Sequence, residues 1–175
     1  MLVEKELCIR QAAAADAPLL AAWWNDGRLM AHAGFPNGTG QTAEQIAQDL
    51  RTDPHSQRQR FILEQNHKPV GEMVCMRGDS RTAEIGIKIC VEAQNQGLGP
   101  RYLSMLCGWL FSQGHEKIIV TTDWENHRAQ HVYERLGFRR TAVLPDAFKD
   151  PQGILHTSVR YDLTPTDFTC AQPKK

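Results

Sequence analysis

The sequence predicts a single α/β domain in which a mixed, mostly antiparallel sheet of about seven strands is flanked by about four helices. Its 175 residues suit one ordinary domain, and its 41% hydrophobic and 23% charged residues are typical of a globular protein. The hydrophobic periodicity changes repeatedly between strand and helix patterns along the chain. We expect the domain to occupy residues 1–163 and residues 164–175 to form a loosely ordered tail.

Each of the four expected helices has a recognisable start or end. Asp16 is placed to cap the first, and Thr42 with Gln45 forms a capping box for the second. The third, Arg101–Phe111, is apolar on nearly all sides and is therefore expected to be buried. The fourth, His127–Leu136, is followed by a glycine, which suits a helix end.

The expected strands are short apolar runs separated by turn residues or helices. In the clearest of them, isoleucine alternates with polar or small residues. Strands joined by short turns favour antiparallel pairing, whereas the helix between Val91 and Lys117 predicts one parallel pair. In chain order, the expected strands are Leu7–Arg10, Arg60–Gln65, Val70–Met76, Thr82–Val91, Lys117–Thr122, Phe138–Leu144 and Ile154–Leu163.

Composition and charge exclude several classes of protein. The 20 Lys and Arg residues balance 20 Asp and Glu residues, so the chain lacks the basic excess typical of nucleic-acid binding. Its longest apolar run, Leu19–Trp24, is far shorter than the ~20 residues of a membrane-spanning helix. The first residues do not resemble a secretory signal, and five unpatterned cysteines favour a reducing, cytoplasmic location. We therefore expect neither nucleic-acid nor membrane partners.

The strongest chemical signal is the segment Gln94–Gly99, which joins the clearest strand to the buried helix. Its glycines allow a sharp turn that exposes backbone N–H groups, and the helix N-terminus adds partial positive charge. These features suit a pyrophosphate, although glycines that serve only the loop geometry are the alternative. No Gly-Lys-Ser/Thr follows, so this is not a P-loop. The first glycine of G-x-G-x-x-G is missing, which argues against a nucleotide-binding oxidoreductase.

A second motif, Asn126–Phe138, has the form N-x-x-A-x-x-x-Y-E-[KR]-x-G-F. Together with the earlier Q-x-x-G-x-G, it resembles the GCN5-related N-acetyltransferase superfamily, and the order of elements is similar to that fold from about residue 5 to residue 163. The front part, with Trp23–Asp26 before a capped helix, resembles the branch that contains ribosomal-protein alanine N-acetyltransferases and some aminoglycoside acetyltransferases.

This resemblance implies that acetyl-coenzyme A is the donor and that its pantetheine arm lies where two strands splay apart after a bulge. Backbone groups near Ile89 and Val91 would bind that arm, and Asn126 would hold it or orient the site. The residues implied to surround the pyrophosphate are Gln94, Asn95, Gln96, Gly97, Leu98 and Gly99. Pro100, which has no N–H, and Gln94, where arginine is common, depart from the pattern and predict weaker coenzyme A binding.

Acetyl transfer needs a proton for the leaving thiolate and a donor for the oxyanion. The resemblance implies that Tyr133 points at the thioester sulfur, so that its phenol would protonate the thiolate. A core tyrosine whose hydroxyl is tied to the backbone is the alternative. A strand N–H near Cys90 or Val91 is the candidate oxyanion donor.

The amine must also lose a proton, and Glu84 is the preferred base, directly or through a water. Glu72 on the neighbouring strand is the reserve candidate, and an ordinary solvated strand residue is the alternative interpretation of Glu84. Asp26 and the loop 146–150 are candidates for contacting a cationic acceptor.

The predicted function is transfer of the acetyl group of acetyl-coenzyme A to a primary amine of a small molecule or a protein N-terminus. Direct attack in a ternary complex is the expected route, and a covalent route through Cys90 is the minor alternative. A coenzyme A-binding sensor or interaction module without turnover is the competing hypothesis. His127 and His131 have the spacing of zinc ligands, but no glutamate follows His127, so no metal is expected. The resemblance also implies a homodimer.

Overall fold

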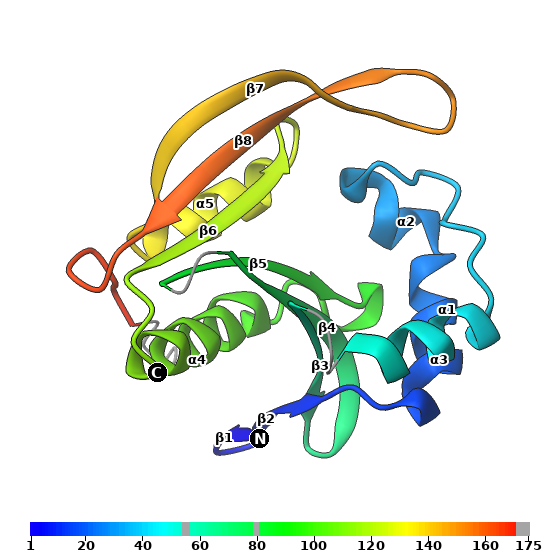
Figure 1. Cartoon of the computed structure of the whole chain (residues 1–175), viewed down its shortest axis with the longest axis horizontal. Coiled ribbons are helices and arrows are strands. Elements are labelled where there is room, and N and C mark those ends of the chain that lie inside the picture. Colours follow the sequence, from blue (N-terminus) through cyan, green and yellow to red (C-terminus); the bar gives the residue numbers. More distant parts are fainter. Residues whose placement is uncertain (54–56, 79–80, 171–175) are drawn as a thin grey trace.

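The computed structural model describes residues 1–53, 57–78 and 81–170, and Figure 1 shows their arrangement. In this part of the chain the strands are β1 (Leu2–Glu4), β2 (Leu7–Gln11), β3 (Arg58–Gln65), β4 (Lys68–Arg77), β5 (Thr82–Ile89), β6 (Lys117–Asp123), β7 (Arg139–Lys149) and β8 (Leu155–Leu163). The helices are α1 (Ala17–Trp24), α2 (Gly27–Met30), α3 (Ala43–Thr52), α4 (Leu98–Ser112) and α5 (His127–Arg135). Short 3-10 turns, η1 (Ala14–Asp16), η2 (Ala31–Ala33) and η4 (Val91–Ala93), join them.

The described strands form one sheet in the order β1-β2-β3-β4-β5-β6-β8-β7. Only β5 and β6 pair in parallel, with α4 as the crossover between them, and the other neighbouring pairs are antiparallel. The predicted mixed, mostly antiparallel sheet is therefore confirmed. It has one strand more than expected, because the three residues of β1 are too few to show alternation. The additional helix is α2, a single turn.

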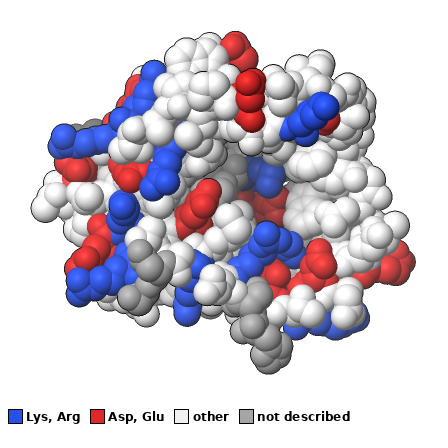
Figure 2. Space-filling model, turned by 45° about the horizontal axis from the view of Figure 1, so that its top comes forward, with Lys and Arg blue, Asp and Glu red and all other residues white. Residues whose placement is uncertain are grey.

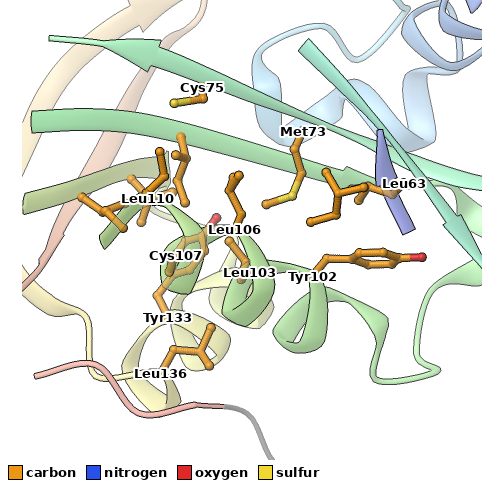
Figure 3. Close-up of a cluster of buried hydrophobic side chains, with 14 of the residues drawn as sticks. Leu63, Met73, Cys75, Tyr102, Leu103, Leu106, Cys107, Leu110, Tyr133 and Leu136 are labelled. Carbon is orange, nitrogen blue, oxygen red and sulfur yellow. The ribbon is translucent and has the colours of Figure 1, made fainter. Parts of the chain in front are cut away.

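Helices cover both faces of the sheet (Figure 1). One face carries α4 and α5, and Figure 3 shows Leu63, Met73 and Cys75 of the strands packed against the leucines of α4. The other face carries α1 and α3, whose buried side chains enclose Ile62. Because neighbouring residues of a strand point to opposite faces, Leu63 and Ile62 each belong to a different layer.

Two helix starts differ from the expectation. The carboxylate of Asp16 does not cap α1; it accepts a hydrogen bond from the Ala13 N–H at 2.8 Å and binds Arg10 at 2.7 Å. The guanidinium of Arg10 offers a charged partner, which a helix cap cannot match. The buried helix α4 begins at Leu98, so Gly99 and Pro100 belong to its first turn.

The segment 164–170, the described part of the expected tail, contacts the domain. The rings of Phe168 and Phe111 lie 5.6 Å apart, and the Thr169 N–H donates to the Leu136 carbonyl at 3.0 Å. Gly137 is needed beneath this segment, because a Cβ there would lie 1.9 Å from the Asp167 carbonyl oxygen. Residues 171–175 lie outside the described part of the chain.

Candidate active site

The central feature of the site is the point where β5 and β6 separate. The two strands pair through Thr82, Ala83 and Glu84 only, and beyond Glu84 they diverge. A cavity of about 430 Å³ lies there, lined by Gly86–Ile89 of β5 and by Thr121 and Thr122 of β6. The register shifts of the described sheet are in the β3–β4 and β7–β8 pairs, so the expected bulge in β5 is not the cause of the divergence. Figure 2 shows a hollow near the middle of one face, with charged side chains of both signs around it.

The glycine loop lies at one wall of this cavity, where it leads into the N-terminus of α4. Asn95 and Gly97 have left-handed backbone angles, with φ of 61° and 73°. A Cβ placed on Gly97 or Gly99 would meet no atom within 4 Å, so packing within the protein does not require glycine at position 99. This openness favours a binding role over the purely geometric alternative. The first-turn N–H groups of α4 have no partner within the helix, and Pro100 removes one of them.

Most of the predicted loop residues line the cavity. Gln94, Asn95, Gly97, Leu98 and Gly99 all do so. The side chain of Gln94 joins the two walls, because its amide donates to the Ile89 carbonyl at 2.9 Å and accepts from Arg128 at 2.9 Å. Gln96 does not line the cavity; its side chain donates to the Glu92 carbonyl at 3.1 Å.

The backbone of β5 offers hydrogen-bonding groups to the gap, though not at all the expected positions. The Cys90 N–H donates to the Val70 carbonyl at 2.9 Å, so it is not free to stabilise an oxyanion. Because strand N–H groups alternate in direction, those of Ile87 and Ile89 face away from β4 and toward the gap. Ile89 lines the cavity, whereas Val91 belongs to η4 and does not.

Tyr133 lines the cavity from α5 and is 5% exposed. Its ring packs between Phe138 and Tyr161, with centroids 5.6 Å and 5.8 Å away. Within residues 1–53, 57–78 and 81–170, its hydroxyl has no hydrogen-bond partner, which disfavours a core tyrosine tied to the backbone. Burial raises the pKa of Tyr133 well above its ordinary value, so the phenol keeps its proton at neutral pH.

Asn126 also lines the cavity, at the start of α5. Its side-chain oxygen accepts a hydrogen bond from the Ala129 N–H at 3.2 Å and thus caps the helix. The cap orients the first turn of α5, the helix that carries Tyr133.

Neither glutamate suggested as the base lines the cavity. Glu84 is half-buried on β5, on the same strand face as Gly86 and Lys88, which do line it. Glu72 is 4% exposed; it accepts a hydrogen bond from the Trp24 indole at 2.6 Å and forms an ion pair with Lys88 at 3.0 Å.

The acidic groups suggested for a cationic acceptor already have partners in the protein. The Asp26 carboxylate binds the Arg28 guanidinium at 2.7 Å, and Asp150 binds His156 at 3.1 Å. Neither lines the cavity, and nor does Asp146, which occupies a left-handed position on β7.

Sequence reasoning missed the basic residues of the cavity. These are Arg28 of α2, His32 of η2, Lys88 of β5 and Arg128 of α5. Arg128 stands inside the recognised N-x-x-A motif, at a position that the motif leaves open. Nothing in the sequence marks Arg28 or Lys88, since only the fold brings their elements together. Across the described ranges, no cluster of three or more His, Cys, Asp and Glu side chains is arranged to hold a metal ion.

A parallel strand pair opens beside the N-terminus of the crossover helix, and this arrangement offers backbone N–H groups to an anion. Comparison with known proteins identifies the class of protein. The sequence model of the acetyltransferase (GNAT) domain matches residues 6–139. The chain therefore belongs to this acetyltransferase family, and the predicted class of enzyme is confirmed.

Solved structures support the same fold. Spermidine N-acetyltransferase from Vibrio cholerae, in complex with CoA and spermine, is 20% identical, with a TM-score of 0.84 over 94% of this chain and 98% of that chain. A ribosomal L7/L12 α-N-protein acetyltransferase in complex with coenzyme A is 16% identical, with a TM-score of 0.82 over 93% and 96%. A putative acetyltransferase from Salmonella typhimurium with its cofactor acetyl-CoA is 19% identical, with a TM-score of 0.74 over 91% and 94%. The second of these represents the branch that the sequence resembles.

Proposed function

We propose that the protein transfers the acetyl group of acetyl-coenzyme A to a primary amine, by direct attack of the amine within a ternary complex. The observation that carries this proposal is the cavity between β5 and β6, which joins the glycine loop to Tyr133. The neighbouring structures that contain CoA or acetyl-CoA give independent support for the donor. The acceptor is an amine of a small molecule or of a protein N-terminus.

The donor is held by the two ends of the cavity. The open N–H groups of the loop and of the first turn of α4 receive the pyrophosphate, as an anion at a helix N-terminus requires. The side chain of Arg128 adds a positive charge on the opposite wall and offsets the donor lost at Pro100. The pantetheine arm lies between β5 and β6, where Ile87 and Ile89 present backbone groups to it.

The chemical step uses groups at the far end of this gap. A neutral amine attacks the thioester carbonyl, the carbon–sulfur bond breaks, and the thiolate takes the proton of Tyr133. The backbone N–H of Ile87 or Ile89 replaces that of Cys90 as the oxyanion donor, because the Cys90 N–H is already bound to Val70. Glu84 accepts the amine proton through a water, since its own side chain does not reach the cavity.

The role of Tyr133 is tested by Tyr133→Phe, which removes only the hydroxyl. We expect kcat to fall about 100-fold, the range of a lost general acid, while the KM for acetyl-coenzyme A changes little. Tyr161→Phe is the matched control, because Tyr161 packs beside Tyr133 but does not line the cavity. Full turnover of Tyr133→Phe would remove this residue from the mechanism.

The base is tested by Glu84→Gln and Glu72→Gln, assayed side by side for kcat across the pH range. Relay through Glu84 predicts a fall of about 10-fold or more in the first variant only, because the neutral amide cannot accept the proton. A loss confined to Glu72→Gln would transfer the role to Glu72, which Lys88 links to the cavity.

A coenzyme A-binding sensor without turnover is the competing function. Incubation of acetyl-coenzyme A with a panel of amines, followed by assay of free thiol, separates the two. Release of thiol that depends on the amine supports the enzyme. Tight binding of the donor with no release for any amine supports the sensor.

Two further proposals concern the setting of the enzyme. The five cysteines all lie in the described residues and are free, which supports the cytoplasm as its location; no helix of the described chain is long and apolar enough to cross a membrane. A homodimer is supported by exposed apolar side chains of the β7–β8 hairpin, namely Val143, Leu144, Ile154 and Leu155. Sedimentation velocity of the protein and of Leu155→Asp would test the dimer.

A further inference from the structure

The charged side chains that line the cavity are all basic. In the part of the chain that the structure describes, its lining includes Arg28, Lys88 and Arg128 but no aspartate or glutamate. Arg128 belongs to the donor end, because it binds Gln94 of the glycine loop. Arg28 of α2 and Lys88 of β5 supply the remaining positive charges of the lining.

Lys88 lies on the side of β5 that faces away from α4. Its neighbours Ile87 and Ile89 pack with the α4 core, and alternation along the strand turns Lys88 to the opposite face. Its ammonium contacts Glu72, which in turn binds Trp24 of α1. Lys88 thus stands on the same side as α1 and α2, across the sheet from the helix that receives the pyrophosphate.

Each of the two basic groups is held by a carboxylate outside the cavity lining. The Lys88 ammonium at 3.0 Å and the Trp24 indole at 2.6 Å both bind the same oxygen of Glu72, Oε1, so the negative charge of this buried carboxylate is paired within the protein. Asp26 binds Arg28 through Nε at 3.1 Å and Nη2 at 2.7 Å. Among the described residues, these contacts use one proton of the Lys88 ammonium and leave the Nη1 donors of Arg28 without a hydrogen bond. The Glu92 carboxylate also acts on Arg28, because its charge helps to raise the pKa of that guanidinium.

Cations with unused donors are suited to bind an anion. A polyamine would place its additional positive charges beside Arg28 and Lys88, with no acidic side chain in the lining to receive them. An amine that bears a carboxylate would instead bring a negative charge to these groups.

We propose that Arg28 and Lys88 select an acceptor whose primary amine lies within a few bonds of a carboxylate. This specificity rests on the proposed acetyl transfer. The shared chemistry fits a free amino acid and also a peptide N-terminus followed by an acidic side chain, and the experiment distinguishes the two.

The test compares kcat/KM for acceptors that differ only in the carboxylate. Glutamate and aspartate are paired with their diamides, a peptide beginning Ser-Asp is paired with one beginning Ser-Asn, and spermidine represents the polycations. We expect at least one acid to exceed its neutral partner by about 10-fold or more, and spermidine to be the poorest acceptor. Preference within the amino-acid pairs or within the peptide pair identifies the source of the anion.

The variants Arg28→Met and Lys88→Met assign this preference to the two side chains. Each should bring the acid-to-neutral ratio close to one by raising the acceptor KM, with kcat and the KM for acetyl-coenzyme A nearly unchanged. Because Lys88→Met leaves Glu72 buried without its cation, the double variant Glu72→Gln/Lys88→Met repeats the measurement without that charge. Lys68→Met, on the exposed part of β4, is the control and should keep the ratio.

Two results would overturn the inference while leaving the acetyltransferase intact. One is equal or faster acetylation of the amides or of spermidine. The other is a preference for the acids that survives in both single variants. If no amine in the panel releases thiol, the proposed function itself fails, and the inference fails with it.

Discussion

His156 shows how one side chain joins parts of the chain that lie far apart in the sequence. Its two ring nitrogens contact the buried carboxylates of Asp123 and Asp150, at 3.3 Å and 3.1 Å. Its ring stacks on Phe148 at 4.8 Å. Asp123 also accepts the Glu125 N–H at 2.7 Å, in the turn that leads to Asn126. The cluster therefore anchors the β7–β8 hairpin beside the candidate site.

The pKa shifts of His156 and Asp150 determine how the stability of this cluster should depend on pH. The hydrogen bond to Asp150, supported by Asp123, raises the pKa of His156 above its ordinary 6.5. The contribution of protonated His156 to the free energy of unfolding is therefore complete below pH 6.5, and it is lost as the pH rises through the raised pKa. Burial opposes ionisation of Asp150, yet hydrogen bonds from His156 and from backbone N–H groups lower the pKa of Asp150 below 3.8. The contribution of the Asp150 carboxylate to the free energy of unfolding is therefore lost only as the pH falls through this lowered pKa.

Urea unfolding at about pH 6 and about pH 9 measures this effect. The protein should lose more unfolding free energy between these conditions than His156→Gln, which cannot be charged. The exposed His131→Gln is the control and should behave like the unchanged protein. Equal pH dependence in all three proteins would contradict the assignment.

The start of α4 shows how an element supplies function through its backbone. Gly97 and Gly114 stand near opposite ends of the helix, both with positive φ, of 73° and 89°. A Cβ on either glycine would meet no atom within 4 Å. Alanine should therefore cost each position a similar backbone strain of about 1 kcal/mol, since neither position has a steric clash.

The two alanine variants should differ in their affinity for acetyl-coenzyme A, although they should lose similar stability. Gly97→Ala places a methyl group in the loop at the mouth of the cavity, and we expect the Kd for acetyl-coenzyme A to rise about 10-fold or more. Gly114→Ala should leave the Kd unchanged. Isothermal titration calorimetry measures both values, and an equal Kd in the two variants would show that the loop does not receive the donor.

For the molecule as a whole, the segment after β8 closes the layer of α4 and α5. Phe168 covers Phe111 and approaches Gly108, while neighbouring residues bond to the start of β7 and the end of α5. Phe168→Ala should lower the free energy of unfolding by about 1–2 kcal/mol, because the ring is only half-buried.

Thermal and urea unfolding test this prediction, with the exposed Val3→Ala as the control, which should change stability by no more than about 0.5 kcal/mol. Neither Phe168 nor Phe111 lines the cavity, so kcat should be unchanged. A Phe168→Ala protein as stable as the control would show that the segment adds nothing to the fold.

Local patterns predicted most of the elements because strand alternation, capping boxes and helix-ending glycines depend on neighbouring residues. They failed where a distant group competes. Asp16 has the side chain of a helix cap, but Arg10 and the Ala13 N–H bind its carboxylate instead. The contacts that position residues 164–170 are made with Phe111, Leu136 and Gly137, and no local pattern within the segment reveals them.

The order of the elements and the two motifs, Gln94–Gly99 and Asn126–Phe138, were enough by themselves to indicate the acetyltransferase family. They also marked Tyr133 as the candidate proton donor. These features are local, since they depend on backbone angles and on spacing along one strand or helix. Only the tertiary structure decided that Glu84 stands outside the cavity, that the Cys90 N–H is already bound, and that Lys88 meets Glu72. Such contacts depend on strand register and on the packing of α1 over the sheet, which bring together residues that are distant in the chain.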